Sequence, residues 1–366
     1  MKIAPVIAAL KAGPAPFEVC LLHTGQHYDA AMNDQFFTAL GIPRPNINLD
    51  VGSASHAVQT SEIMRRFEPI LDQEMPDAVL VVGDVNSTIA CALVAAKKAV
   101  KVIHVEAGLR SYDRTMPEEI NRVLTDQISD ILFTTEREAE ENLRREGITA
   151  ERIHFVGNVM IDTLRSQLPH ATPVAETLRR AGVSESFLGS KQRYAILTLH
   201  RPSNVDDSTV LRTLLRAVAD ISRSLPVIFP VHPRTRSRIE GFGLMELIPE
   251  ANLTLLPPQG YLEMLGLMKD ARLVLTDSGG IQEETTALGV PCVTLRQNTE
   301  RPITVTEGTN TIVGTDPEKI HAVVKDILQT GGKSGKSPEF WDGKAAHRIA
   351  AVLHEWLDRV PRRQVA

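Results

Sequence analysis

Short apolar runs alternate with amphipathic segments along most of this chain. The runs have the length and composition of buried strands, and they cover residues 77–84, 100–106, 130–134, 152–156, 194–199, 227–231 and 273–275. Between them apolar residues recur at helical spacing, as Ile63, Phe67 and Leu71 do within residues 55–73. This alternation predicts mostly parallel sheets with helices on both faces.

One polar stretch interrupts the alternation. Residues 166–192 are polar and contain two prolines, and we interpret them as the approach to a domain boundary. The pattern predicts an α/β fold of two Rossmann-like, doubly wound domains that face each other across a cleft. We expect an N-terminal domain over residues 1–168, with the C-terminal helix of residues 344–366 packing back on it, and a C-terminal domain over residues 169–343.

The beginning of the chain departs from this pattern. Residues 3–10 predict a helix, and residues 16–25 predict a strand with its exit loop. A doubly wound domain normally opens with a strand. Therefore, either this fold begins with a helix or the natural protein starts upstream of Met1.

A glycine-rich loop stands out in the second half. The apolar run 273–275 ends at Asp277, and a helix-compatible segment follows, so the loop delivers Ser278, Gly279 and Gly280 to a helix N-terminus. Free N–H groups and the helix dipole favour a phosphate there. Glu284, one turn on, could accept hydrogen bonds from ribose hydroxyls. An ordinary glycine-rich turn remains the alternative.

Polar residues also follow other predicted strands. Asp84, Glu106, His200, His232 and Ser278 all lie at carboxyl ends, where open α/β sheets bind their ligands. Two facing domains would bring these residues together across the cleft. Each residue has a structural alternative, because strand-end carboxylates often cap helices and a lone histidine is often a hydrogen-bonded structural residue.

Composition narrows the classes of function. The chain has 366 residues, 43% of them hydrophobic and 23% charged, with a formal net charge of −5. These values are typical of a soluble globular protein and give no electrostatic case for nucleic acid or an anionic membrane. Cys20, Cys91 and Cys292 lie far apart in apolar segments, as core residues do. With no signal peptide or membrane-length run, we expect a cytoplasmic protein.

Several rival sites are weaker. His104 and Glu106 would share one face of a strand, but no second His or Cys pair has metal-ligand spacing, so we expect no metal. A hydrolase is disfavoured because there is no Gly-x-Ser-x-Gly. Gly332-Lys333-Ser334 and Gly335-Lys336-Ser337 lack the remaining P-loop glycine and the preceding strand. No dinucleotide fingerprint follows a strand either, so we expect no cofactor.

The chain resembles the non-hydrolysing UDP-N-acetylglucosamine 2-epimerases, which have the two-domain GT-B fold. The most specific matching motifs are HVEAGLR (104–110), PEEINR (117–122) and DSGGIQEE (277–284). Shorter matches span the rest of the chain: Gly83-Asp84, residues 199–202, TERP (299–302), EGTN (307–310) and WDGKAA (341–346). The resemblance implies a UDP-binding C-terminal domain and a homodimer.

The resemblance also implies roles for single residues. Those that match catalytic positions of the family are Asp84, Glu106, Glu118 and His200. Nucleotide-binding positions are matched by Ser278, Gly279, Gly280, Glu284 and Arg301, and Lys2 would match a nucleotide-contacting lysine. Arg122, one helical turn after Glu118 on the same helix face, would serve the cleft as a charge partner, with a surface helical ion pair between these two residues as the structural alternative. His232 would line the cleft. Gln26 and His27 resemble part of a regulatory UDP-N-acetylglucosamine site of bacterial members.

One departure concerns the family's first strand and its Gly-Thr-Arg-Pro-Glu loop, which have no counterpart before Met1-Lys2-Ile3. A start codon placed too late, or a truncated chain, would explain this.

The implied reaction converts UDP-N-acetylglucosamine to UDP-N-acetylmannosamine by elimination and re-addition of UDP through 2-acetamidoglucal, and would serve the synthesis of a surface polysaccharide. Carboxylates and histidine are suitable proton-transfer groups for it. The alternatives are a GT-B glycosyltransferase, a hydrolysing epimerase and a non-catalytic UDP-sugar-binding protein.

Overall fold

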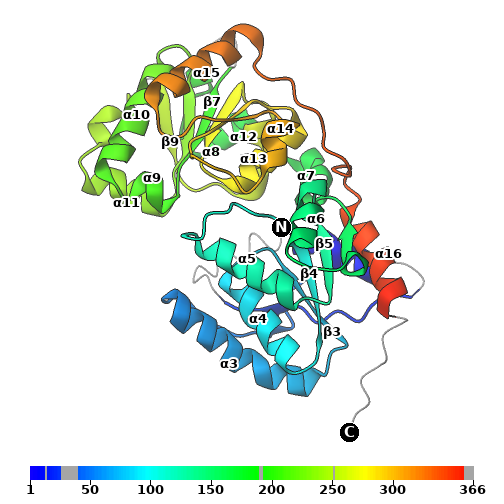
Figure 1. Ribbon diagram of the computed structural model, residues 1–366. Helices are drawn as coiled ribbons and strands as arrows, with labels where there is room; N and C mark the ends of the chain where they lie inside the picture. The colour runs from blue at the N-terminus through cyan, green and yellow to red at the C-terminus, as the bar shows by residue number, and fades with distance from the viewer. Residues whose placement is uncertain (13–14, 26–39, 189–192, 250–251, 358–366) are drawn as a thin grey trace. The chain divides into compact units, whose positions relative to one another are not determined.

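The computed structural model describes residues 1–12, 15–25, 40–188, 193–249 and 252–357. The chain forms two compact units (Figure 1). Unit 1 comprises Met1–Thr163 together with Glu339–Ala366, and unit 2 comprises Leu164–Pro338.

The main sheet of unit 1 is parallel and has the strand order β3-β4-β5-β6. These strands are β3 (Ala78–Val82), β4 (Lys101–Ala107), β5 (Ile131–Thr134) and β6 (Ile153–Phe155). A separate parallel pair is formed by β1 (Leu22–His23) and β2 (Ile47–Asn48). Because all these strands are parallel, the carboxyl ends of β3 and β4 meet at the same edge of the sheet.

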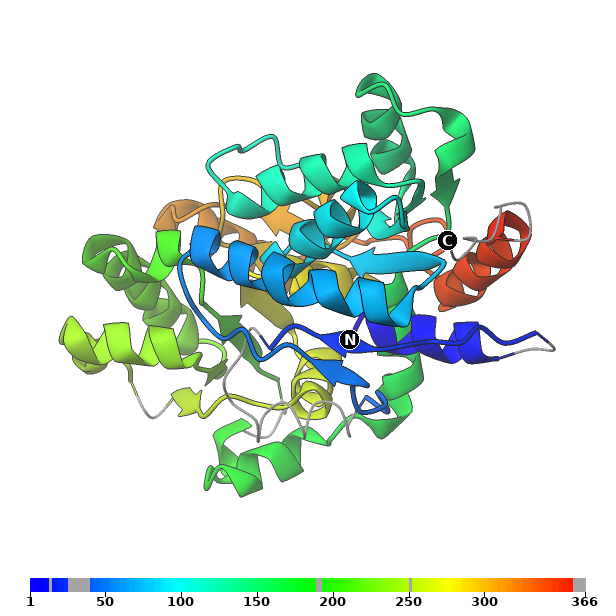
Figure 2. The ribbon, with the colours of Figure 1, turned by 90° about the horizontal axis from the view of Figure 1, so that it is seen from below.

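Helices cover both faces of this sheet. They are α1 (Ile3–Lys11), α3 (His56–Glu74), α4 (Asn86–Lys97), α5 (Pro117–Ile128), α6 (Arg137–Arg145), α7 (Val159–Gln167) and α16 (Ala345–Leu357). Figures 1 and 2 show α3, α4 and α5 side by side. Neighbouring residues of β4 point to opposite faces: Val102 packs with α3 and α4, whereas Ile103 packs with α1 and α16. This arrangement makes the unit doubly wound.

The last helix, α16, has its N-terminus capped by a residue that is distant in the sequence and belongs to unit 1. The carboxylate of Asp162, on α7, accepts the backbone N–H groups of Ala345 and Ala346 at 3.1 and 2.7 Å. Burial raises the pKa of Asp162 although these hydrogen bonds oppose the shift. The segment before the helix contributes Trp341, a fully buried side chain.

Unit 2 is built on a six-stranded parallel sheet with the order β12-β11-β10-β7-β8-β9. Its strands are β7 (Ala195–Thr198), β8 (Val227–Pro230), β9 (Leu253–Leu256), β10 (Leu273–Thr276), β11 (Cys292–Thr294) and β12 (Asn310–Ile312). From β7 the order runs one way through β8 and β9, and from β10 it runs the other way through β11 and β12. The carboxyl ends of β7 and β10 are therefore the topological switch point, where open α/β sheets bind ligands.

Helices cover both faces of this sheet too, and together with the sheet they form two apolar clusters. They are α8 (Val174–Arg180), α9 (Pro202–Val205), α10 (Ser208–Ser222), α11 (Pro233–Gly241), α12 (Tyr261–Lys269), α13 (Gly279–Leu288), α14 (Pro302–Thr306) and α15 (Pro317–Thr330). Short 3-10 turns occur at Ala150–Arg152 in unit 1 and at Leu168–His170, Glu185–Leu188 and Met245–Leu247 in unit 2. Over the described ranges, no helix is both long and apolar enough to cross a membrane.

Candidate active site

In unit 1, Asp84 and Glu106 lie at neighbouring strand ends. Val82 of β3 pairs with Val105 of β4, so Asp84 and Glu106 both lie at the edge of the sheet where the strands have their carboxyl ends. Glu106 has a φ of +73°, and the β4–β5 register shifts at this position. A non-glycine residue in the left-handed region costs roughly 1–3 kcal/mol and often marks a functional site. The bulge, rather than strand alternation, thus sets the direction of the Glu106 side chain.

The Glu106 carboxylate is almost fully buried and paired with a lysine. Its side chain is 1% exposed, and Lys2 Nζ lies 2.6 Å from its Oε1. Lys2 also lies over the neighbouring strand end, because a Cβ built on Gly83 would be 3.7 Å from its Nζ. The structure therefore brings Lys2, Glu106 and the residue before Asp84 together.

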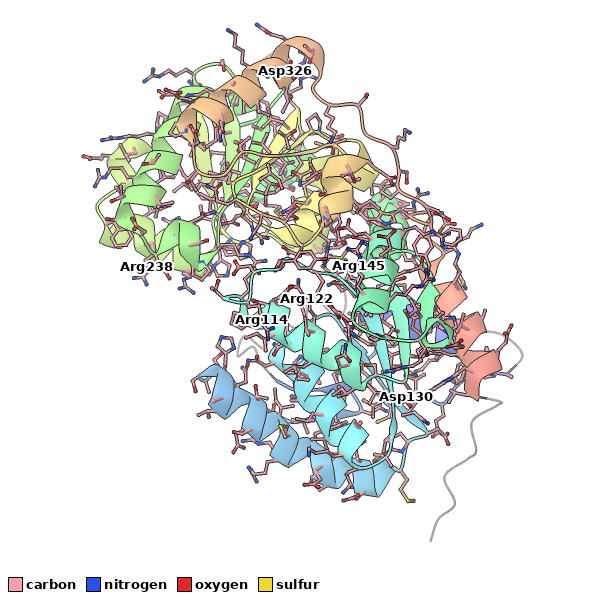
Figure 3. The ribbon with its side chains drawn as sticks, viewed as in Figure 1. Arg114, Arg122, Asp130, Arg145, Arg238 and Asp326 are labelled. Carbon is pink, nitrogen blue, oxygen red and sulfur yellow. The ribbon has the colours of Figure 1, made fainter. Side chains whose placement is uncertain are left out.

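Arg122 bridges two carboxylates from its position on α5, where Figure 3 labels it. It donates from Nε and Nη2 to Asp84 Oδ2 at 3.1 and 2.6 Å, and from Nη1 to Glu119 Oε2 at 2.8 Å. Arg122 forms its ion pairs with Asp84 and Glu119, and the alternative of a surface ion pair with Glu118 is not what the structure shows. Glu119 in turn accepts the N–H groups of Ser111 and Tyr112, both at 2.9 Å. Arg122 thereby fixes Asp84 to the loop before α5.

The helix α5 buries its polar face. Glu119, Arg122, Thr125 and Asp126 are its buried residues, whereas Ile120 and Leu124 are 41% and 50% exposed. This is the reverse of an ordinary surface helix. The polar face of α5 is buried because it packs against the carboxyl ends of the strands, where buried polar groups need hydrogen-bond partners. Glu118 lies half-buried in the first turn of the same helix.

His104 is not available to a metal. Its Nδ1 lies 2.7 Å from Asp126 Oδ1 and its Nε2 lies 2.8 Å from the Gly83 carbonyl oxygen. Among the residues that the structure describes, no three His, Cys, Asp or Glu side chains are grouped so as to hold a metal ion.

In unit 2, His200 follows β7 and is paired with the buried Asp277, which follows β10. His200 Nδ1 lies 2.9 Å from Asp277 Oδ1, and the His200 ring is 39% exposed. The backbone N–H groups of His200 and Arg201 donate to Asp277 Oδ2, both at 3.0 Å. Burial alone would raise the pKa of Asp277, but the hydrogen bonds and charge of His200 outweigh it and lower that pKa. Asp277 is therefore ionised, and its carboxylate orients the His200 ring.

His232 follows β8 and lies beside His200, with ring centroids 6.1 Å apart. Its Nδ1 accepts the N–H of Arg234 at 3.2 Å. Partial burial lowers the pKa of His232, and the charges of His200 and Arg234 add to the effect. Both histidines thus lie at one edge of the unit 2 sheet.

The glycine loop opens α13, with Ser278 at the N-cap position and Gly279 as the first helical residue. A Cβ on Gly279 would lie 2.3 Å from Glu300 Oε1. The space on the Cβ side of Gly279 is therefore filled by the chain's own Glu300 carboxylate. Burial opposes ionisation of Glu300, but Arg301 and Arg296 outweigh it and lower its pKa to about 2.

Arg301 and Glu284 complete this part of the site. Arg301 is buried and its Nε lies 2.7 Å from Glu283 Oε1. Glu284, 4% exposed, lies on the next position of α13. Burial raises the pKa of Glu284 to about 7 against a hydrogen bond from Tyr261, and the charge of Glu283 adds to the rise.

Comparison with known proteins shows the family of this chain. A sequence model of the family described as UDP-N-acetylglucosamine 2-epimerase matches residues 9–354. The UDP-N-acetylglucosamine 2-epimerase of Methanococcus maripaludis is 42% identical over 356 residues, which cover 96% of this chain and 94% of that protein. The chain belongs to the UDP-N-acetylglucosamine 2-epimerase family.

Two further members of the epimerase family bear on fold and substrate. A crystal structure of Methanocaldococcus jannaschii UDP-GlcNAc 2-epimerase in complex with UDP-GlcNAc and UDP is 41% identical, with a TM-score of 0.83 and coverage of 97% of this chain and 96% of that one. This likeness confirms the fold class. The UDP-2,3-diacetamido-2,3-dideoxy-D-glucuronate 2-epimerase of Pseudomonas aeruginosa is 41% identical over 338 residues, covering 91% of this chain and 90% of that protein.

Sequence reasoning missed several residues of this candidate site. It did not single out Glu119, Asp126, Asp277 or Glu300. Two features of the sequence could have identified them. Glu119 and Asp277 lie within the PEEINR and DSGGIQEE motifs, and one face of α5 carries polar residues at the spacing where a buried helix face usually carries apolar ones. Gln26 and His27, the expected regulatory residues, lie outside the described residues.

Proposed function

We propose that this chain catalyses the reversible epimerisation of UDP-N-acetylglucosamine to UDP-N-acetylmannosamine at carbon 2 of the sugar. The observation that carries the proposal is the pair of carboxylates, Asp84 and Glu106, at adjoining strand ends of unit 1, each within hydrogen-bond distance of a cation. Membership of the epimerase family supports the same reaction. Proton transfer at a carbon needs groups of this kind held in fixed positions.

The reaction proceeds by elimination and re-addition. A base takes the proton from carbon 2, the bond between carbon 1 and the UDP oxygen breaks, and a carbon 1–carbon 2 double bond gives 2-acetamidoglucal. UDP then adds back to carbon 1 while carbon 2 receives a proton on its opposite face. Asp84, Glu106 and Glu118 supply the proton-transfer groups, in an assignment that leaves open which one is the base.

Residues of unit 2 hold the leaving nucleotide in this proposal. Ser278, Gly279 and Gly280 begin α13, whose N-terminal N–H groups favour a diphosphate. Arg301 supplies positive charge, Glu284 contacts the ribose, and His200 and His232 lie near the phosphate or sugar. Because Asp277 accepts from Nδ1, the His200 ring keeps Nε2 for a ligand.

Proton NMR in heavy water tests the reaction. With UDP-N-acetylglucosamine we expect UDP-N-acetylmannosamine carrying deuterium at carbon 2. Free N-acetylmannosamine would instead identify a hydrolysing enzyme, and an unchanged spectrum would contradict the proposal. Glu106→Gln is expected to abolish turnover and leave UDP binding intact, whereas the exposed Glu74→Gln should behave as the unaltered protein. Near-normal turnover of Glu106→Gln would remove Glu106 from the mechanism.

A second substrate follows from one relative. The Pseudomonas aeruginosa protein is named for UDP-2,3-diacetamido-2,3-dideoxy-D-glucuronate, and its identity to this chain equals that of the Methanocaldococcus jannaschii enzyme to within one percentage point. The same NMR assay with that sugar nucleotide compares the two substrates. If kcat/KM is higher for UDP-2,3-diacetamido-2,3-dideoxy-D-glucuronate than for UDP-N-acetylglucosamine, the glucuronate nucleotide is the preferred substrate.

The assembly, location and regulation of the protein extend this proposal. The family resemblance supports a homodimer, which light scattering after size-exclusion chromatography tests. A nucleotide-sugar substrate supports a cytoplasmic location, which cell fractionation tests. Gln26 and His27 belong to a regulatory UDP-N-acetylglucosamine site in this proposal, so Gln26→Ala should remove any activation by substrate while keeping basal turnover.

A further inference from the structure

The buried histidine of β4 has no role in the reaction as described above. The His104 side chain is fully buried, and both ring nitrogens face an acceptor. The Gly83 carbonyl oxygen can only accept, so Nε2 donates to it. The remaining question is which group donates between Nδ1 and Asp126.

The other contacts of Asp126 answer that question. Its Oδ2 accepts the Gly108 N–H at 3.1 Å and lies 2.7 Å from Arg110 Nη2, so it is an ionised carboxylate. Its Oδ1 therefore accepts from His104 Nδ1, and the ring donates from both nitrogens. Arg110 is balanced in turn by Glu146, whose Oε1 accepts from Nε at 2.8 Å.

In this network His104, Asp126 and Arg110 are buried, whereas the Glu146 side chain is 27% exposed. Asp126 contacts both His104 and Arg110, and Glu146 pairs with Arg110 from the other side. A buried ionic network is tolerated when its members are satisfied in this way, and removal of one member leaves an uncompensated charge. The network is thus a rigid part of unit 1.

Its contacts end next to the proposed proton-transfer groups. Gly83, which accepts from His104, directly precedes Asp84, and Gly108, which donates to Asp126, lies two residues after Glu106. The Gly83 N–H donates in turn to the Val105 carbonyl at 3.0 Å. Asp126 also lies one helical turn after Arg122, which holds Asp84. One ring thereby connects the β3 exit loop, the bulged end of β4 and α5.

We propose that His104 is a positioning residue that sets the separation of Asp84 and Glu106 through its two hydrogen bonds. This inference rests on the proposed function. A misplacement of about 1 Å between reacting groups can reduce a rate by about 100-fold. Loss of His104 should therefore lower kcat and leave the affinity for UDP, which the proposed function assigns to unit 2, unchanged.

The test compares His104→Gln with a matched control, His154→Gln. A glutamine carries both of its N–H groups on one nitrogen, so it cannot reproduce the hydrogen bonds that the two separate ring nitrogens of His104 make with Gly83 and Asp126. His154 lies on β6 of the same sheet, half-buried, with its ring centroid 5.9 Å from that of Phe133. We expect His104→Gln to lower kcat about 10- to 100-fold with KM and the UDP Kd within about threefold. His154→Gln should keep kcat.

Amide hydrogen exchange provides a readout that does not depend on turnover. In His104→Gln, exchange in residues 83–85 and 106–110 should become at least about tenfold faster, and His154→Gln should not change it. Asp126→Asn should reproduce both effects if His104→Gln does not fold. Unchanged exchange in these loops together with unchanged kcat would overturn the proposal. Faster exchange in a protein that never acts on the UDP-sugars would retain the positioning role and reject the proposed function.

Discussion

The Nδ1 atom of His200 lies 2.9 Å from a carboxylate oxygen of Asp277, a residue that is completely buried. The two residues come from neighbouring strands of the switch point, β7 and β10, and are 77 positions apart in the sequence. Asp277 also accepts the N–H groups of His200 and Arg201. The carboxylate therefore fixes the backbone and the ring of His200 together.

Asp277→Asn should lower kcat about 10- to 100-fold, because an amide keeps the shape of the side chain but no longer attracts the His200 ring as an anion. UDP affinity should change by less than about threefold. Steady-state kinetics and calorimetric UDP binding measure both. The exposed Asp270→Asn is the control. Equal kcat values for the two variants would remove Asp277 from the positioning of His200.

Arg122→Lys should inactivate the protein and destabilise it by about 2 kcal/mol, since a lysine cannot bridge Asp84 and Glu119 as the guanidinium fork does. Urea denaturation and the NMR assay measure the two effects. Arg65→Lys alters an exposed pair with Glu62 and should change the free energy of unfolding by no more than about 0.5 kcal/mol. A stable, active Arg122→Lys variant would show that the bridge has no importance.

Gly279→Ala should destabilise the protein by about 1–3 kcal/mol, because its Cβ would overlap the Glu300 carboxylate that Arg296 holds in place at 2.9 Å. UDP affinity should fall as the start of α13 shifts. Gly241→Ala in α11 is the control, as its Cβ meets nothing within 4 Å. Should both variants unfold at the same urea concentration, Glu300 can move aside, and the close contact is not a constraint.

The sequence was sufficient for what depends on local pattern. Apolar runs identified the principal strands, and Asp277 to Gly280 identified the start of α13. It was insufficient where a tertiary contact chooses between equivalent neighbours. Glu118 and Glu119 lie four and three residues before Arg122, so helical spacing permits either pairing. The position of Asp84 on another element decides for Glu119.

Two further features could not be predicted from the local pattern. Strand alternation placed His104 and Glu106 on one face, but the bulge at Glu106 interrupts the alternation. A glycine at a helix N-terminus also looks the same in sequence whether a ligand or a side chain approaches it. Glu300, which fills the space beside Gly279, is 21 positions away and follows a different strand. Roles in catalysis and binding remain predictions for each residue named.

Glu284 should make the protein less stable as the pH rises from 4.5 to 8. Its pKa is raised from 4.5 to about 7 by burial, so the folded protein binds a proton more tightly than the unfolded chain does. The associated stability is fully present below pH 4.5 and is lost as the pH rises through 7. A shift of this size corresponds to about 3 kcal/mol.

The Glu284→Gln variant isolates this contribution, because every other titrating group is common to both proteins. Urea denaturation at pH 4.5 and at pH 8 gives the difference in unfolding free energy between Glu284→Gln and the unaltered protein. That difference should increase by about 3 kcal/mol in favour of glutamine at pH 8. Glu318→Gln, on the exposed first turn of α15, should show no such increase. A difference independent of pH would mean that Glu284 ionises in the folded protein as readily as in the unfolded chain.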